Sequence, residues 1–264
     1  MNVKILEKNP KHVKFVLEKA TPAFANALRQ IMVAEIPIMA IDYADIEKNS
    51  TGLFDELLAH RLGLIPLKFN PKLFNLREEC KCGGRGCSRC EVVFSLEGTG
   101  PCTLHSGDLK SNDESVKPAD PNIPIVELLE GRTLKLQAVA SLGLGKNHTK
   151  YQAAVVGYRY MPQIRINKDK CNVCGKCVEK CPEHILQKKS GKITVVNSIE
   201  CPLCMYCVDN CEKDAIAVTG DSKNIIFTVE STCGLSTQDV IRQALDILDK
   251  KLLDFRDELE KVVK

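Results

Sequence analysis

Residues 171–182 read Cys-Asn-Val-Cys-Gly-Lys-Cys-Val-Glu-Lys-Cys-Pro, and this stretch decides the fold of the segment around it. Its four cysteines follow the spacing C-x2-C-x2-C-x3-C. The same spacing returns 30 residues later, without the proline, in Cys201, Cys204, Cys207 and Cys211. A repeat of fixed period indicates a duplicated structural unit. We therefore predict a small domain made of two similar halves that are organised around their cysteines.

This spacing is that of bacterial ferredoxins, which bind 4Fe–4S clusters. Three thiolates on one tight loop can reach three irons of a cube, but the chain has turned away before the fourth cysteine. In two-cluster ferredoxins the fourth cysteine ligates the other cluster. Carried over by position, one cluster is assigned to a first set, Cys171, Cys174, Cys177 and Cys211. The other cluster is assigned to a second set, Cys201, Cys204, Cys207 and Cys181. Zinc sites or disulfides are the disfavoured alternative.

The charge around these cysteines argues against a free electron carrier. Residues 166–220 contain eight lysines and seven acids, which gives a net charge of +1. Low-potential ferredoxins are usually strongly acidic, because they dock on basic partners by electrostatic attraction. The chain also shows no flavin, nicotinamide or Walker fingerprint. A structural or redox-sensing role is favoured, and a redox subunit that transfers electrons is the alternative.

A separate group of cysteines lies in a turn rich in Gly, Arg and Lys. Its spacing is C-x-C-x4-C-x2-C, formed by Cys80, Cys82, Cys87 and Cys90. Four thiolates in so short a loop can close a tetrahedral zinc site that takes the place of a hydrophobic core. We predict one zinc ion here, with free or disulfide-bonded thiols as the alternative. Cys102 and Cys233 stand alone, and we expect both to be buried thiols.

Composition limits the remaining possibilities. The chain has 264 residues, 44% of them apolar, and a formal net charge of +3. This suits one large or several small globular domains. Nucleic-acid-binding proteins usually carry a strongly basic face, which we do not find. We also see no signal peptide and no apolar run of about 18 residues that would span a membrane. We expect a cytoplasmic protein with little direct nucleic-acid contact and no membrane contact.

Hydrophobic periodicity predicts a mixture of helices and strands. The expected helices span Thr21 to Pro37, Leu53 to Leu64, and a long final segment that begins with the capping sequence Ser236 to Asp239. The expected strands cover residues 3–17, 92–96, 133–144, 153–160, 192–196 and 224–230, and residues 110–122 form a polar loop. The final helix carries an apolar stripe, Val240, Ala244, Leu248, Leu252, Phe255, Leu259 and Val262. This stripe predicts packing either on its own domain or in a helix bundle between subunits.

Four segments of the chain resemble a known family. Residues 26–41 and the more specific Phe54-Asp-Glu-Leu-Leu-Ala-His-Arg-Leu-Gly-Leu-Ile-Pro-Leu67 are similar to the family of RNA polymerase alpha and archaeal D subunits. Residues 142–151 look like the family's Gly-rich segment, and residues 236–262 fall where the family has its last dimerisation helix. The resemblance spans the chain, and several archaeal D subunits carry a ferredoxin-like insert at this place.

The resemblance implies an α+β fold with three parts. These are a discontinuous alpha-like dimerisation domain (1–40 and 221–264), an inserted mostly-β domain (41–165) that often binds zinc in relatives, and an inserted ferredoxin-like domain (166–220). It implies that the first and last helices, including Phe24, Leu28 and Ile31, pair with the small L subunit. The pair would then seed assembly with the N and P subunits and the large B subunit. The chain itself would be non-catalytic, and we find no nucleophile–base constellation in it.

Overall fold

The fold is described from a computed structural model, in which residues 1–263 are described. Lys264, the last residue of the predicted dimerisation domain, lies outside the described residues. The chain divides into two compact units. Unit 1 contains Met1–Glu7, Lys14–Asn26 and Gly157–Thr228, and unit 2 contains Lys8–Val13, Ala27–Val156 and the chain from Val229 onward. Both units mix helices and strands, with sheet predominating, so the predicted α+β class is confirmed.

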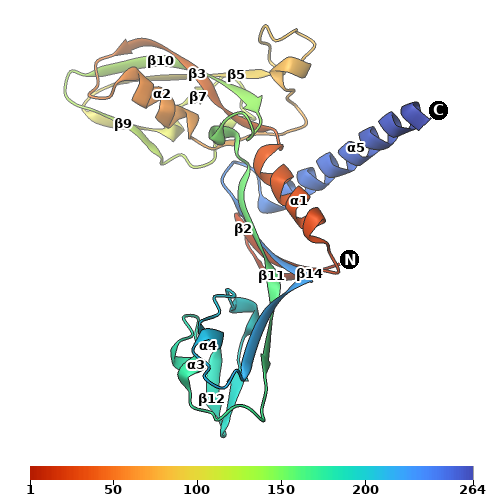
Figure 1. Ribbon diagram of the computed structural model, residues 1–264. Helices are drawn as coiled ribbons and strands as arrows, with labels where there is room; N and C mark the ends of the chain where they lie inside the picture. Colours follow the sequence, from red (N-terminus) through yellow and green to blue (C-terminus); the bar gives the residue numbers. More distant parts are fainter. Residues whose placement is uncertain (264) are drawn as a thin grey trace. The chain divides into compact units, whose positions relative to one another are not determined.

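Figure 1 shows the elements along the chain. The helices are α1 (Pro22–Ala34), α2 (Asp55–Gly63), α3 (Lys176–Glu179), α4 (Tyr206–Asp209) and α5 (Thr237–Val263). The first strands are β1 (Asn2–Lys8), β2 (His12–Glu18), β3 (Ile38–Asn49), β4 (Leu67–Lys68), β5 (Glu91–Thr99), β6 (Cys102–His105) and β7 (Lys110–Ser111). The later strands are β8 (Lys117–Pro118), β9 (Pro124–Leu128), β10 (Thr133–Gly143), β11 (Ala154–Ile166), β12 (Leu186–Lys189), β13 (Lys192–Val195) and β14 (Ile216–Ser231).

Both predicted helix starts are present. At the start of α1 the hydroxyl of Thr21 accepts a hydrogen bond from the backbone N–H of Phe24 at 3.2 Å. At the start of α5 the hydroxyl of Ser236 accepts from the N–H of Asp239 at 3.2 Å and donates to its carboxylate at 2.6 Å. In the usual capping box the acid accepts from the backbone N–H of the cap residue instead. Side chains thus satisfy backbone donors that the first turn leaves without an intrahelical partner.

Unit 1 is organised by a sheet of order β1-β2-β14-β11. Phe15 of β2 and Phe227 of β14 stack at 5.3 Å between ring centroids, and Tyr158 of β11 lies 5.5 Å from Phe227. Strands β11 and β14 continue from this sheet to the cysteine repeat (Figure 1). The predicted strand at 224–230 was therefore too short. Its real start at Ile216 lies in the core of the repeat, where Ile216 and Val218 are buried.

Unit 2 contains a sheet of order β3-β10-β5-β7. Strand β10 pairs antiparallel with both β3 and β5, so it is covered by hydrogen bonds along both edges. Leu58 and Leu62 of α2 are completely buried. The antiparallel pairs β4–β8 and β6–β9 complete this unit. The predicted polar loop at 110–122 includes the two-residue strands β7 and β8, which are too short to leave a periodic pattern in the sequence.

Two expectations about burial are wrong. Cys102 is exposed at the start of β6, where its thiol lies 3.6 Å from the carbonyl of Thr99, although Cys233 is buried as expected. Leu28 and Ile31 of α1 are each 3% exposed within the chain itself, so they are not open to a partner. The periodicity of these residues indicates an apolar face of the helix. Periodicity alone does not show whether that face is buried inside the chain or against another subunit. Within residues 1–263, no helix combines the length and apolarity needed to cross a membrane.

Candidate metal centres

The four thiols of Cys80, Cys82, Cys87 and Cys90 converge on one point. Each of their sulfur atoms lies within 4.8 Å of the other three. The separations are 3.6 Å for Cys80–Cys87 and 3.7 Å for both Cys82–Cys90 and Cys87–Cys90. Zinc–sulfur bonds of about 2.3 Å in a tetrahedron place the sulfurs roughly 3.8 Å apart. This loop, residues 80–90, therefore has both the donor atoms and the spacing for one zinc ion.

Local contacts shape this four-cysteine loop. Gly86 has a φ of +92°, a conformation that side-chain-bearing residues rarely adopt. A Cβ atom at Gly86 would collide with a carboxylate oxygen of Glu91. That carboxylate forms an ion pair with Arg77, just before the loop. The glycine thus lets the Arg77–Glu91 pair close the base of the loop.

The pKa values of two loop thiols are shifted in opposite directions. Hydrogen bonding with Cys80 lowers the pKa of Cys82 to about 6. Burial raises the pKa of Cys90 to about 12. A metal ligand must be a thiolate, so Cys90 would not be one at neutral pH without a compensating cation. A divalent ion at the centre would supply this charge, and the sulfur spacing suits such an ion.

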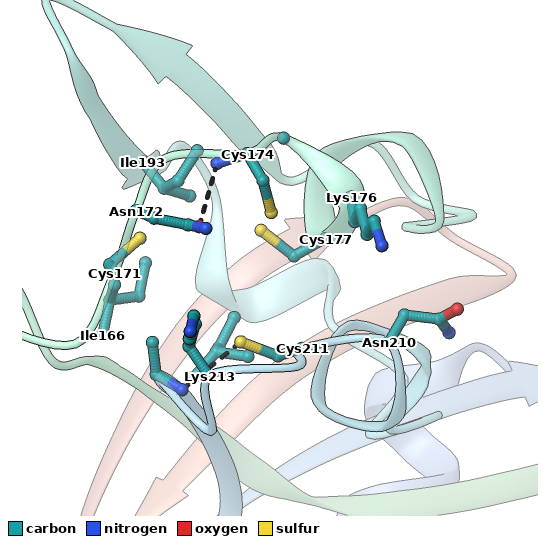
Figure 2. Close-up of a pocket in the computed structure, with 13 residues that line it drawn as sticks. Ile166, Cys171, Asn172, Cys174, Lys176, Cys177, Ile193, Asn210, Cys211 and Lys213 are labelled. Atoms are coloured by element: carbon teal, nitrogen blue, oxygen red, sulfur yellow. Dashed lines mark hydrogen bonds between the residues drawn. The ribbon is translucent and has the colours of Figure 1, made fainter.

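The four cysteines of the first set line one pocket (Figure 2). Ile166, Ile193 and Ile216 form part of its wall. Asn172 accepts a hydrogen bond from the backbone N–H of Cys174 at 3.3 Å and so orders the loop between the first two cysteines. The structure therefore brings Cys211, from the second half of the repeat, to the three cysteines of the first half. Thiolates around an apolar-walled space suit an iron–sulfur cluster.

The second set lies deeper. Cys181, Cys201 and Cys207 are buried at 7%, 5% and 9% exposure, and Cys204 is exposed. The three buried cysteines belong to one hydrophobic core that also contains Ile185, Leu186, Ile193, Ile216 and Val218. This core supplies the apolar surroundings that a cluster's ligands need. The same core contains Cys181 from the first half of the repeat together with Cys201 and Cys207 from the second half.

Electrostatic interactions among the thiols follow the same division. Burial raises the pKa of Cys177, and negative charge on the other three members of the first set raises it further. Burial raises the pKa of Cys207 to about 11, and again the other three members of the second set contribute. Each thiolate thus interacts with the partners that crossed ligation assigns to it. Cationic iron among these thiolates would relieve the repulsion.

The backbone repeats as well as the sequence. Val173 and its counterpart Leu203 have positive φ values of 57° and 61°. Gly175 and its counterpart Met205 also share the left-handed region, at 93° and 67°. These residues precede α3 and α4, the short helices that carry Cys177 and Cys207. Because the two halves adopt the same turns at the same positions, both loops present their cysteines in the same way.

Comparison with known proteins agrees with this geometry. Residues 170–216 match the 4Fe-4S dicluster domain, and residues 44–164 match the RNA polymerase Rpb3/RpoA insert domain. A protein of Archaeoglobus fulgidus named DNA-directed RNA polymerase subunit Rpo3 is 44% identical, over 98% of each chain. The Rpo3 subunit of Methanothermobacter thermautotrophicus is 41% identical, over 100% of this chain and 98% of its own. That of Thermococcus kodakarensis is 36% identical, over 98% of each.

The chain belongs to the Rpo3 family. Rpo3 is the archaeal D subunit of DNA-directed RNA polymerase, so the resemblance found in the sequence is confirmed. As an Rpo3 chain, it is a subunit of a nucleotidyltransferase complex that acts in transcription. The other subunits of that polymerase are its partners. The match to the dicluster family also identifies residues 170–216 as an iron–sulfur domain.

Sequence reasoning missed one group beside the second set of this Rpo3 chain. Lys14 of β2 donates to the carboxylate of Glu200 at 2.9 Å, and Arg159 of β11 lies 3.9 Å from the same carboxylate. Arg159 also donates to the carbonyl of Ile199 at 2.7 Å. We call Lys14, Arg159 and Glu200 the Glu200 clasp. Lys14 and Glu200 are 186 positions apart, so local sequence gives no signal for their contact.

Proposed function

We propose that this chain is a non-catalytic assembly subunit that pairs with the small L subunit of the polymerase through helix α5. The pair would then recruit the N, P and B subunits in the cytoplasm, with little direct contact to nucleic acid. Membership of the Rpo3 family supports a role inside the polymerase. The observation that carries the pairing is the division of α5 into a buried and an exposed part.

The start of α5 packs within its own unit, and the remainder does not. Thr237, Val240 and Ala244 are buried. Every described residue from Asp249 to Val263 is exposed. This exposed part nevertheless continues the apolar stripe, and Leu252 and Phe255 are 60% and 66% exposed. In Figure 1 it extends free of the other elements of its unit.

An exposed apolar stripe of this length requires a covering surface. Large contiguous apolar patches on a protein's surface usually mark an interaction site. An amphipathic helix typically places such a stripe in a partner's groove or against a partner's helix. The buried start of α5 fixes the helix to its own unit, and Lys251 adds a partly exposed ion pair with Glu35 beyond α1 at 2.5 Å. The stripe is thus presented from a fixed base, as pairing with L requires.

The same proposal includes the domain and metal assignments. We infer a dimerisation domain of residues 1–40 and 221–264, a second domain of 41–165, and an iron–sulfur domain of 166–220. The first set would hold one 4Fe–4S cluster and the second set another, and the four-cysteine loop would hold zinc. The thiol geometry described above supports each assignment. In these roles the metals would cross-link the short loops that carry the cysteines.

Replacement of Leu252 by Asp tests the pairing. A carboxylate in an apolar seam costs several kcal/mol if it stays unpaired, so L binding should weaken by at least about 100-fold. The matched control is Lys250→Asp, which puts the same side chain on the opposite, polar side of the exposed helix. The measurement is the dissociation constant of purified variants for L, together with their iron content. Equal affinities for wild type and L252D would overturn the proposed interface.

A further inference from the structure

We propose that the two cluster sites of this chain are unequal. The first set forms an open site from which iron exchanges with solution, and the second set forms a shielded site that is fastened to the sheet of unit 1. This inference rests on the proposed two clusters and adds their regulation. The first site would respond to iron supply while the second maintains the folded domain.

Burial of the ligands is the first argument. In the second set Cys181, Cys201 and Cys207 are buried and Cys204 is exposed. The four cysteines of the first set all lie within the described chain. None of them is buried, and Cys174 is exposed. The pocket of the first set is also open to solvent. The ligands of the first set therefore lie closer to solvent than the buried ligands of the second set.

The Glu200 clasp is the second argument. Glu200 directly precedes Cys201, the first cysteine of the second set. It is held by Lys14, whose side chain is only 13% exposed, and Arg159 adds a hydrogen bond to the backbone of Ile199. Hydrogen bonds to charged groups are stronger than neutral ones, especially when they are partly shielded from water. Two strands of the sheet thus hold the segment that enters the second set.

Packing on the other side of this loop is the third argument. Leu203 lies between Cys201 and Cys204, and its side chain lies 3.3 Å from the Cβ position of Gly220 on β14. Tyr160 of β11 approaches the same position from the strand side, at 2.9 Å. Any side chain at Gly220 would displace one of them. The loop of the second set therefore rests directly on the two strands that lead to the sheet.

The corresponding contact of the first set is weaker. Lys176, in the first loop, forms an ion pair with Glu212, but their side chains are 52% and 75% exposed. Ion pairs between exposed side chains contribute little to stability. Val173, the counterpart of Leu203, packs on the core of the repeat, as Leu203 also does, so this packing does not favour the first loop over the second. The first loop can therefore open locally while the second stays closed, because local opening requires only the contacts of the opening segment to break.

Iron release to a chelator tests the inequality. The full chain is loaded with iron without oxygen and mixed with excess EDTA, and the release of iron is followed with time. Protein that starts with about eight irons should lose about four quickly and four at least tenfold more slowly. Cys201→Ser/Cys204→Ser protein, which keeps the first set, should show the fast phase. Cys171→Ser/Cys174→Ser protein, which keeps the second set, should show the slow phase.

Variants of the two acidic residues test the clasp. Glu200→Gln should accelerate the slow phase by up to about tenfold, because the amide oxygen still accepts from Lys14 but the charge that strengthens this hydrogen bond is lost, and should leave the fast phase unchanged. Glu212→Gln is the matched control and should change neither phase by more than about twofold. Release of all eight irons in one phase, or a fast phase assigned to the second set, would overturn the inequality. Protein that never binds eight irons would instead overturn the proposed clusters.

Discussion

The four-cysteine loop and the cysteine repeat collect their thiols in opposite ways. The loop takes four sulfurs from consecutive turns of one short segment, and they already lie within 4.8 Å of one another. Among residues 1–263, these four thiols are the group whose sulfur atoms all lie within 4.8 Å of one another. Within the same residues, the thiols of the repeat form no group that meets this limit. In the repeat, the first set instead surrounds a pocket and includes a cysteine from the other half. Thiols that nearly touch suit a single ion, and thiols around a space suit a larger cluster.

This difference has a mechanical consequence. Metal in the four-cysteine loop can cross-link only the loop itself, so its loss should remain local. Each set in the repeat joins the two halves, because Cys181 lies with the second set and Cys211 with the first. Loss of either cluster should therefore remove one of the two cross-links between the halves. The predictions below test this contrast between local and crossed ligation, from the largest effect to the smallest.

The largest effect is expected for Cys181→Ser. Although this residue stands in the first run of the sequence, its loss should remove about four irons from the second set. In Cys171→Ser/Cys174→Ser protein, which lacks the first cluster, adding Cys181→Ser should remove all remaining iron. In Cys201→Ser/Cys204→Ser protein the same change should remove none. Iron analysis after anaerobic purification measures both results. This non-additive pattern is expected when Cys181, Cys201 and Cys204 ligate the same cluster.

Cys102→Ser is the control for these serine variants, since Cys102 is an exposed thiol outside both sets. It should keep full iron content. Crossed ligation is refuted if Cys181→Ser removes iron from Cys201→Ser/Cys204→Ser protein, because Cys181 would then serve the first set.

The sequence predicted the parts that depend on local chemistry. The starts of α1 and α5 follow from Thr21 and Ser236, whose hydroxyls cap the first turn wherever the helix lies. The spacing of the cysteines likewise indicated that the first three thiols of each run would lie near one another, because a two-residue gap limits how far neighbouring sulfurs can separate. These features depend on residues close together in the chain.

What the sequence did not predict depends on distant residues. Lys14 of β2 and Glu200, which directly precedes Cys201, meet only in the folded structure, because they are 186 positions apart in the chain. The periodicity of α1 indicated an apolar face but not that Leu28 and Ile31 would be buried inside the chain. The stripe of α5 is continuous in sequence, yet only its first part has a partner within the described residues. Periodicity identifies a face to be buried and leaves open what covers it.

An intermediate effect is expected for Cys82→Ser in the four-cysteine loop. Hydrogen bonding with Cys80 lowers the pKa of Cys82 to about 6, which favours its thiolate form. Its loss should weaken zinc binding by more than the roughly 10–100-fold that loss of an outer hydrogen-bond partner costs. Iron content and the rate of iron release should stay unchanged, because ligation in the loop is local. Competition with a chromophoric zinc chelator measures the affinity.

Cys102→Ser again serves as the control and should keep its zinc. A fall in iron content in the Cys82→Ser protein would contradict the separation between the loop and the repeat. Unchanged zinc affinity would show that the converging thiols are not the zinc site.

The smallest effect is expected from two glycines of the loop. Gly83 and Gly86 both have positive φ values, of 66° and 92°, so alanine at either position costs about 1–2 kcal/mol of backbone strain. Gly83 has open space around its Cβ position, whereas Gly86 faces the carboxylate of Glu91. Gly86→Ala must therefore also displace Glu91 from Arg77. We expect Gly83→Ala to weaken zinc binding by about tenfold and Gly86→Ala to weaken it further, as competition with the same chelator would measure.

Glu91→Gln separates the two contributions. It weakens the ion pair with Arg77 but leaves the backbone of Gly86 as it is. If displacement of Glu91 causes the extra loss, Gly86→Ala should cost less zinc affinity in Glu91→Gln protein than in wild type, because part of the interaction is already gone. Equal costs in both backgrounds would mean that backbone strain alone sets the shape of the loop. In either case iron content should not change, since the loop closes on its own ligands.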